Sequence, residues 1–324
     1  MLYKNNFEKY IFNLTEIAEE ILIIAWYPHK FFKLSLGKQD KISEIIDGLK
    51  LDSNKYINEK ELIIAIRENS EKRDFLLRYV PYRLLSVFFK DKLQGVTEAK
   101  RNSFIENISI DEFDTIKPLY KFVTPNKIEI HQDWLHYLKF NFSIVESWSL
   151  WKWLNYLQSR NPNVPAISKK LFPPLERNSL TNQTKYWKSI LQEVELNCIY
   201  TGKLLNDSKI TLDHFLPWSF VGHDQLWNLI PVDRSTNSSK SNNIPDLKYL
   251  SGFIEMQHKG LIISKSKIQE SSWKNQTEPF IVDLQIKDFN DLLDIDKLNS
   301  SYYSVIPPLM QLAKNIGFSC NWKY

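Results

Sequence analysis

Apolar residues recur at three- and four-residue intervals over much of the first half of the chain, which predicts amphipathic helices. The first such pattern runs from Phe7 to Trp26, and Pro28 ends it. Further helices are predicted at 39–49, 59–67, 71–79 and 134–158. The last of these segments is dense in aromatic residues, which indicates one or two buried helices. Because no convincing strand alternation precedes residue 160, we expect the first half to be mostly α-helical.

The pattern breaks at 159–180, which contains four prolines and four basic residues against a single acidic one. Closely spaced prolines indicate an extended, stiff connection between domains. Two interpretations remain open for this segment. It is either a solvated connection without a partner, or a basic strap along nucleic acid in which Lys169 and Lys170 contact phosphates.

After residue 180 the pattern predicts a helix, two strands and a second helix, in that order. Thr181 or Asn182 is a suitable N-cap for the first helix. The segments 210–218 and 227–232 are rich in residues that favour strands. The polar segment 234–243 begins with residues that cap helices, so the second helix is expected there.

These patterns predict an α+β fold in several parts, and a length of 324 residues suits about two domains. The predicted parts are a helical N-terminal domain at 1–158, a proline-rich basic linker at 159–180, a strand-containing domain at 181–250 and a mixed, partly helical C-terminal extension at 251–324. No internal repeat or low-complexity tract is present in the sequence.

The amino-acid composition indicates the cellular compartment of the protein more clearly than it indicates the function. Two cysteines cannot build a disulfide framework or a four-cysteine zinc site, and they indicate a reducing compartment. The apolar run at 21–26 is too short to span a bilayer, and the N-terminus differs from an export signal. We therefore expect a cytoplasmic protein with no membrane contact. The net charge of +4 is too small to imply a nucleic-acid partner by itself.

Basic residues are concentrated at 72–101, where eight face three acidic residues among several aromatic ones. Basic side chains among aromatic rings suit a surface that binds nucleic-acid strands, with Arg78 and Arg83 among its contacts. The alternative is an amphipathic helix with a solvated basic face. By contrast, the segment 181–250 carries seven basic and seven acidic residues.

Residues that suit phosphodiester hydrolysis gather on the predicted strand–strand–helix segment. Asp213 and His214 end the first strand, Asn228 lies on the second, and Asn237 and Lys240 lie on the helix. A histidine with a pKa near neutrality can remove a proton from water. A hard divalent cation prefers oxygen ligands, which aspartate and asparagine supply. The set therefore suits one Mg²⁺ or Mn²⁺ better than a structural zinc.

These residues, with Pro217, Ser219-Phe220 and Ile244-Pro245 at fixed offsets, resemble the HNH nuclease motif of the ββα-metal fold. The segment is especially similar to the HNH domain of RNA-guided CRISPR effector nucleases. The resemblance implies that His214 is the general base and that Asp213 and Asn237 hold the metal. It also implies that Asn228 braces the loop and orients the histidine, and that Lys240 faces a phosphate. His223 and Asp224 fall outside the motif and are interpreted as loop residues.

The chain departs from the family at the zinc that braces many HNH proteins through two Cys-x-x-Cys pairs. Cys198 is present, but the other three positions hold Thr201, Asp233 and Thr236. A structural zinc is therefore not expected.

The resemblance implies a metal-dependent endonuclease that cuts DNA and leaves 5′ phosphates. A free-standing HNH protein of this size also resembles effectors of bacterial restriction and anti-phage systems. Three alternatives stay open at this point: a nuclease that acts on RNA, a non-catalytic nucleic-acid-binding or scaffold protein with a relic HNH unit, and an N-terminal domain that binds a partner protein of a defence system.

Overall fold

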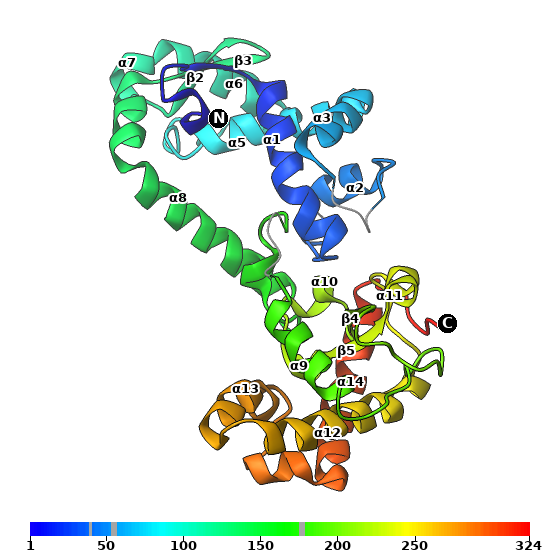
Figure 1. Cartoon of the computed structure of the whole chain (residues 1–324). Helices are drawn as coiled ribbons and strands as arrows, with labels where there is room; N and C mark the ends of the chain where they lie inside the picture. The colour runs from blue at the N-terminus through cyan, green and yellow to red at the C-terminus, as the bar shows by residue number, and fades with distance from the viewer. Residues whose placement is uncertain (39–40, 53–56, 175–178) are drawn as a thin grey trace. The chain divides into compact units, whose positions relative to one another are not determined.

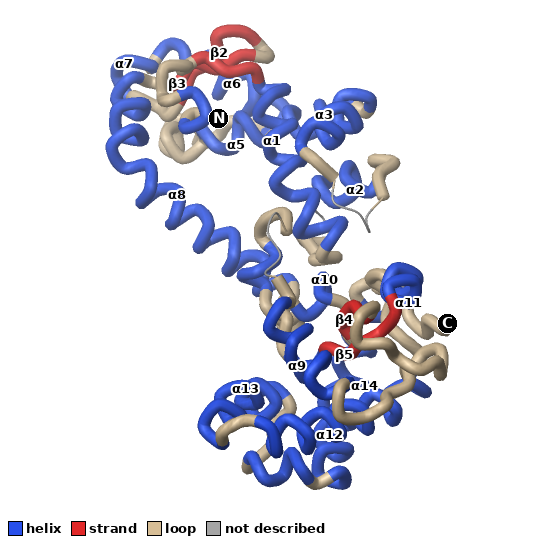
Figure 2. The backbone as a smooth tube through the Cα atoms, viewed as in Figure 1, coloured by secondary structure: helices blue, strands red, loops and turns tan. Residues whose placement is uncertain are grey.

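The computed structural model describes residues 1–38, 41–52, 57–174 and 179–324 and divides the chain into two compact units, Met1–Asn161 and Pro162–Tyr324 (Figure 1). Helices dominate both units, and each unit also contains one small sheet (Figure 2). The fold is therefore mixed α+β and mostly helical, as the sequence predicts. None of the described helices combines the length and the apolarity that crossing a bilayer requires.

The helices of the first unit follow the predicted pattern in part. They are α1 (Leu14–Trp26), α2 (Lys41–Asp47), α3 (Glu59–Glu68), α4 (Ser70–Asp74), α5 (Val80–Leu85), α6 (Glu98–Asp111), α7 (Phe113–Ile116) and α8 (Gln132–Arg160). The helix predicted at 71–79 is instead split between α4 and the 3-10 helix Phe75–Arg78. Pro81 lies in the first turn of α5, where a proline is tolerated, so a new helix begins there.

The first unit is mostly α-helical, as expected, but it also contains a three-stranded antiparallel sheet that the sequence pattern does not reveal. Its strands are β1 (Ile11–Asn13), β2 (Tyr120–Thr124) and β3 (Lys127–Ile130), in the order β1-β3-β2. Each strand has only three to five residues, which is too short for a clear alternation. Phe12, Phe122 and Ile128 face a core that they share with Leu85 and Ile105 from the helices.

The helix predicted at 134–158 is present as α8, a single element of 29 residues. Its predicted burial is wrong, because Leu157 is the one buried side chain among the described residues of α8. Backbone angles at Asn141 are not helical, so α8 is kinked there. The aromatic residues that the sequence places in a core are instead exposed or half-buried on this helix.

The segment 159–180 is not an extended strap over the part that the structure describes. Ile167–Lys170 form a 3-10 helix, and both of these end residues are buried. Lys170 Nζ donates to the carbonyl oxygens of Pro165 and Phe220, each at 2.6 Å. The segment is therefore packed onto the second unit. The residues 175–178, with part of the predicted charge, lie outside the described residues.

The second unit places a two-stranded sheet among helices. Its elements are α9 (Thr181–Leu191), β4 (Ile210–His214), α10 (Trp218–Val221), β5 (Leu229–Asp233), α11 (Arg234–Lys240), α12 (Leu250–Lys267), α13 (Glu270–Asp283) and α14 (Ile295–Asn315). Strands β4 and β5 are antiparallel, with Asp213 opposite Ile230 and His214 opposite Leu229. The predicted order of helix, strand, strand and helix is present, with α10 and a short 3-10 helix between the strands.

One apolar core runs through the second unit. Trp187, Leu229, Phe253 and Tyr302 all belong to it, so α9, β5, α12 and α14 pack together. Side chains from the helices also bind the backbone at the start of β5: Trp187 Nε1 and Gln257 Nε2 donate to the Leu229 carbonyl oxygen, at 3.1 and 2.9 Å. The segment 251–324, predicted as an extension, shares the core of the strand-containing domain.

Candidate active site

The β4–β5 hairpin and α11 bring the predicted residues of the strand–strand–helix motif together. Helix α11 packs against both strands, beside the hairpin in Figure 1. Asn237 Nδ2 donates to the carbonyl oxygen of Leu212 at 3.0 Å, and Lys240 Nζ donates to that of His214 at 2.6 Å. Asn237 and Lys240 are three residues apart and therefore share one face of the helix. That face is held against the end of β4.

Asn228, predicted on the second strand, instead ends the 3-10 helix Leu226–Asn228 directly before β5, and it braces the loop that follows His214. Its Oδ1 accepts from the Leu216 N–H and its Nδ2 donates to the Leu216 carbonyl, both at 2.8 Å. The Asn228 carbonyl also accepts from the Phe215 N–H at 2.8 Å. Asparagine suits this position because its side chain offers both a donor and an acceptor. Asn228 is fully buried, so its bonds act on the loop and not on a substrate.

The His214 ring is held by a carboxylate that the sequence motif does not contain. His214 Nε2 lies 2.8 Å from Asp224 Oδ1, and both side chains are mostly buried. The hydrogen bond to the carboxylate favours the proton on Nε2 and leaves Nδ1 as the acceptor. Nδ1 makes no hydrogen bond with any described residue. Asp224 was expected to be a loop residue, since no fixed spacing marks it as a partner of His214.

Contacts of His223 and a turn at Gly222 support the loop that carries Asp224. The His223 ring packs on the Trp227 ring at 5.2 Å between centroids, and His223 Nδ1 accepts from the Gln225 N–H at 3.3 Å. Burial lowers the pKa of His223, which favours its neutral form. Gly222 turns the chain at φ +75°, a conformation that favours glycine. His223 therefore packs the loop, with Asp224 beside it.

Asp213 has both carboxylate oxygens engaged. Oδ1 accepts from Lys240 Nζ at 3.0 Å and Oδ2 accepts from the Tyr200 hydroxyl at 2.8 Å. Burial, and then the Asp213 charge, raise the pKa of Tyr200 well above its usual value. Burial lowers the pKa of Lys240, and the Asp213 charge opposes that shift. These three side chains form one buried polar group below the end of β4.

Lys240 does not face a phosphate, so that prediction is wrong for the structure described. Its side chain is 0% exposed and its ammonium group is bound to Asp213 and to the His214 carbonyl. The motif offset places Lys240 on α11, but the offset does not determine which way a long flexible side chain turns. Here it turns inward, because a buried carboxylate is available to balance its charge.

The donor set at this site suits a hydrated hard cation. Mg²⁺ keeps several waters and needs only one or two protein oxygens, which the Asp213 carboxylate and the Asn237 amide oxygen can supply. Asn237 Oδ1 makes no hydrogen bond with the described residues. Among those residues no three or more His, Cys, Asp or Glu side chains are grouped as metal ligands. The donor chemistry therefore fits, provided that the Lys240 ammonium releases Asp213 Oδ1.

The positions where many HNH proteins carry the two Cys-x-x-Cys pairs are packed differently in this chain. Cys198 is 1% exposed and belongs to the apolar core of the second unit. Thr236 is also buried, on α11. Apolar packing thus surrounds the one cysteine that the chain retains from the zinc pattern.

The residues outside the motif that were predicted to contact nucleic acid differ in how exposed they are and in whether they form ion pairs. Arg78 is exposed, with its guanidinium group 5.2 Å from the Tyr79 ring, and Lys169 is exposed as well. Arg83 is exposed but forms an ion pair with Glu98. Lys170 is fully buried and bonded to two carbonyl oxygens, so its predicted role as a phosphate contact is wrong.

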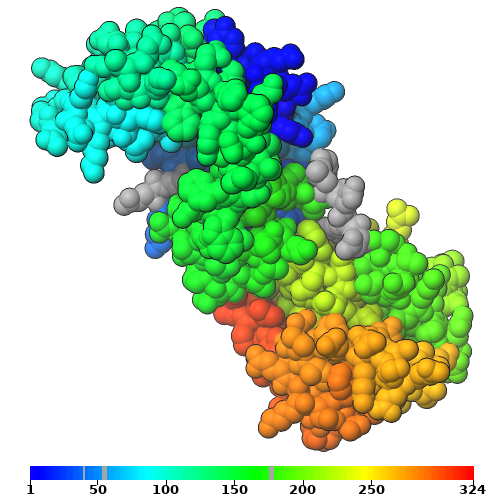
Figure 3. All heavy atoms as spheres, turned by 90° about the vertical axis from the view of Figure 1, so that its left-hand side faces the viewer, coloured from blue at the N-terminus to red at the C-terminus, as the bar shows by residue number. Residues whose placement is uncertain are grey.

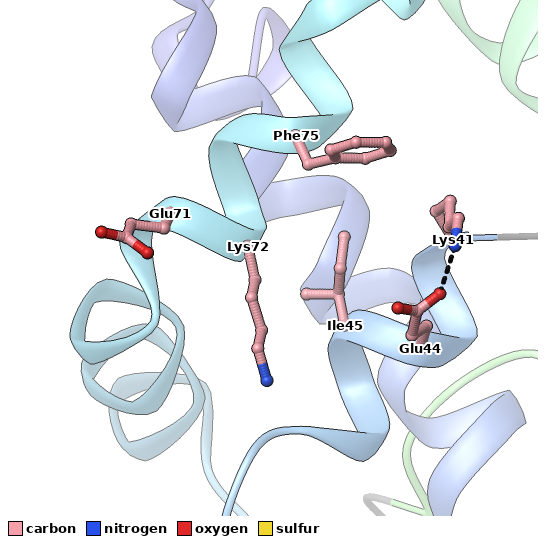
Figure 4. A pocket seen from close by; sticks show the side chains of 6 residues that line it. All are labelled: Lys41, Glu44, Ile45, Glu71, Lys72 and Phe75. Carbon is pink, nitrogen blue, oxygen red and sulfur yellow. Dashed lines mark hydrogen bonds and ion pairs between the residues drawn. The ribbon is translucent and has the colours of Figure 1, made fainter.

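A hollow of about 310 Å³ lies in the first unit, away from the motif residues in sequence (Figure 4). It is lined by Lys41, Glu44, Ile45, Glu71, Lys72 and Phe75. Lys41 and Glu44 form an ion pair across part of its wall. Two lysines and two glutamates leave the lining without net charge, so it does not resemble a phosphate-binding site.

Comparison with known families matches residues 198–246 to the model of a family described as HNH endonuclease. No curated protein and no solved structure matches the chain. The matched segment contains β4, β5 and α11, together with all five residues of the predicted motif. Residues 198–246 are therefore an HNH-family domain.

Proposed function

We propose that this chain is a metal-dependent endonuclease that hydrolyses phosphodiester bonds in DNA, and that it serves as an effector in bacterial restriction or anti-phage defence. One observation carries the proposal. The His214 ring is held at Nε2 by Asp224, while Nδ1 makes no hydrogen bond with the described residues. A fixed imidazole with one ring nitrogen left to accept a proton suits a general base.

In the proposed reaction His214 Nδ1 takes a proton from water as the water oxygen bonds to phosphorus. The bond from phosphorus to the 3′ oxygen breaks, and that oxygen takes a proton from solvent. The products are a 5′ phosphate and a 3′ hydroxyl. Asp224 holds the ring in position and stabilises the imidazolium that forms. Asn228 keeps the loop after His214 in place through the Leu216 backbone.

Asp213 and Asn237 would hold the divalent cation. When bound, the cation supplies positive charge that neutralises the phosphate and stabilises the leaving oxygen. Lys240 balances the Asp213 charge in the structure described. The proposed function therefore includes a second position for the Lys240 ammonium, in which Asp213 Oδ1 is released.

The experiment is a plasmid-cleavage assay with Mg²⁺ or Mn²⁺, with EDTA as the metal-free condition and an RNA of similar length as the alternative substrate. The His214→Ala variant should lose about 10²- to 10⁴-fold in cleavage rate, the usual effect of removing a general base. His136→Ala is the matched control, because His136 is an exposed histidine of the first unit. Cleavage by His214→Ala at the parent rate would contradict the proposal.

A second candidate function has its own observation. The Asp213 carboxylate is 2% exposed and both of its oxygens are bonded, which suits a relic domain that binds nucleic acid without cutting it. This candidate predicts that the parent chain binds a DNA duplex but takes up no Mn²⁺ in a titration followed by electron paramagnetic resonance. The nuclease proposal predicts Mn²⁺ uptake that Asn237→Ala weakens.

A further inference from the structure

Helix α8 carries an apolar stripe that stays exposed among the described residues of the first unit. Its members are Tyr137, Phe140, Ile144, Trp148 and Trp151, which are 50%, 73%, 69%, 60% and 60% exposed. In Figure 3 the green surface of α8 faces the viewer over much of its length. Large contiguous apolar patches are rare on soluble monomers and mark interaction sites. The stripe therefore needs an occupant.

The spacing of the stripe is symmetric about Ile144. Phe140 and Trp148 lie four residues to either side of it, and Tyr137 and Trp151 lie seven. Residues at these separations share one face of a helix. All five remain exposed despite the kink at Asn141. Reversing the order of these residues therefore leaves their spacing along the sequence unchanged.

The charged residues within this span lie off the stripe. Lys139 and Glu146 are exposed, but neither is three, four or seven residues from any member of the stripe. Ser147 lies three residues from Ile144, and its small side chain leaves room for a second helix to approach closely. The stripe is thus uncharged and bordered near its centre by a small residue.

We propose that two copies of this chain form a dimer through α8, with the helices antiparallel and a two-fold axis at Ile144. A two-fold interface must be complementary to itself, which the symmetric spacing satisfies. In this pairing Tyr137 lies opposite Trp151 of the second copy, and Phe140 lies opposite Trp148. Ile144 meets its own counterpart at the axis.

The apolar area of the stripe is large enough for a stable dimer interface. A large side chain buries about 150–250 Å² when fully covered, so five side chains exposed by half or more supply roughly 500–700 Å² per copy. The two copies together would bury about 1,000–1,400 Å², which reaches the lower range of specific interfaces. Surfaces that stack nucleic-acid bases pair aromatic rings with a positively charged groove. Here Lys152 over Trp148 is the one cation paired with a stripe ring among the described contacts, which favours a protein occupant.

The test is sedimentation equilibrium of the full chain across a range of concentrations. The parent should reach a dimer, and Ile144→Asp should raise the dissociation constant by more than about a hundredfold, because two carboxylates would meet in an apolar contact. Ile144 is exposed in a single copy, so the substitution should leave the circular dichroism spectrum unchanged. Lys139→Glu is the matched control on α8 and should leave the dimer intact.

A mixing experiment tests the position of the axis. Ile144→Asp and Ile144→Lys should each be monomeric alone, and an equimolar mixture should form a dimer, because residue 144 of one copy then faces the opposite charge. A monomeric parent, a dimer that Ile144→Asp leaves intact, or a mixture that stays monomeric would each overturn the proposal. A monomeric parent whose tryptophan fluorescence responds to oligothymidylate would assign the stripe to nucleic acid instead.

Discussion

At the scale of single residues, the proposed chemistry depends on how the His214 ring is held. The motif places His214 beside Asp213, but the hydrogen bond at Nε2 comes from Asp224, ten residues further along the chain. That contact depends on how the loop after α10 folds back, which local spacing does not encode. Asn228 and Asn237 lie close to the elements that the motif offsets predict, Asn228 in the short 3-10 helix directly before β5 and Asn237 on α11.

The pairing of His214 with Asp224 predicts a loss of turnover when the charge is removed. Asp224→Asn should lower kcat by about 10- to 100-fold with little change in KM, because the ring loses its orienting carboxylate and not a substrate contact. Asp224→Glu should recover part of the rate. Asp207→Asn, at an exposed acidic residue of the same domain, is the control. A changed unfolding midpoint with an unchanged kcat would instead show that Asp224 supports only the fold.

The buried pair of Lys240 and Asp213 predicts a large effect on stability. Lys240→Met should lower the free energy of unfolding by about 3–5 kcal/mol, because it leaves the Asp213 carboxylate buried without a counter-charge. Adding Asp213→Asn should restore much of that loss. Lys209→Met, at an exposed lysine, should change stability by less than about 0.5 kcal/mol. Urea denaturation of the parent, the two single variants and the double variant measures these effects. Equal midpoints for the parent and Lys240→Met would contradict the prediction.

At the scale of elements, sequence patterns located the long and regular segments well. The helix predicted at 59–67 is α3, and the strand predicted in 210–218 contains β4. The short strands β1, β2 and β3 were missed because three to five residues carry too little periodicity, and because β1 pairs with a strand that is distant in sequence. The burial of α8 was mispredicted because aromatic density does not distinguish a buried helix from one with an exposed aromatic face.

The 3-10 helix Ile167–Lys170 was also mispredicted, as part of a linker, because its docking depends on one buried lysine. Burial lowers the pKa of Lys170 to about 7, below its ordinary value. Above pH 7 the folded chain therefore holds this lysine neutral, while the unfolded chain still binds the proton up to a pH of about 10.5. The unfolded state binds more protons in this window, so the free energy of unfolding should rise with pH there.

The Lys170 prediction is tested by comparing the parent with Lys170→Met between pH 7 and 10. The parent should gain up to about 1.4 kcal/mol of stability per pH unit relative to the variant, since one pKa unit corresponds to that energy. His223 titrates below this window, because burial lowers its pKa as well. Parallel pH profiles for the two proteins would show that Lys170 is not neutral in the folded chain.

At the scale of the whole molecule, the segment that contains the HNH-family domain lacks an excess of positive charge. The segment 181–250 carries seven basic and seven acidic residues, so phosphate contacts must come from elsewhere in the chain. The structure reduces the predicted set of such contacts, because Lys170 is buried and Arg83 is paired with Glu98. Arg78 and Lys169 remain exposed. They are the residues of that set most available to a phosphate.

Charge reversal at these two residues therefore tests whether nucleic acid is bound outside the HNH-family domain. Arg78→Glu and Lys169→Glu should each weaken DNA binding and reduce the slope of log Kd against log salt by about 0.9 per lost phosphate contact. Arg83→Glu should have a smaller effect, because Glu98 already neutralises that charge. Lys274→Glu on α13 is the control, since Lys274 is paired with Glu270. If every variant keeps the parent slope, the two exposed cations do not contact DNA, and the basic surface of the first unit is better explained by a partner protein.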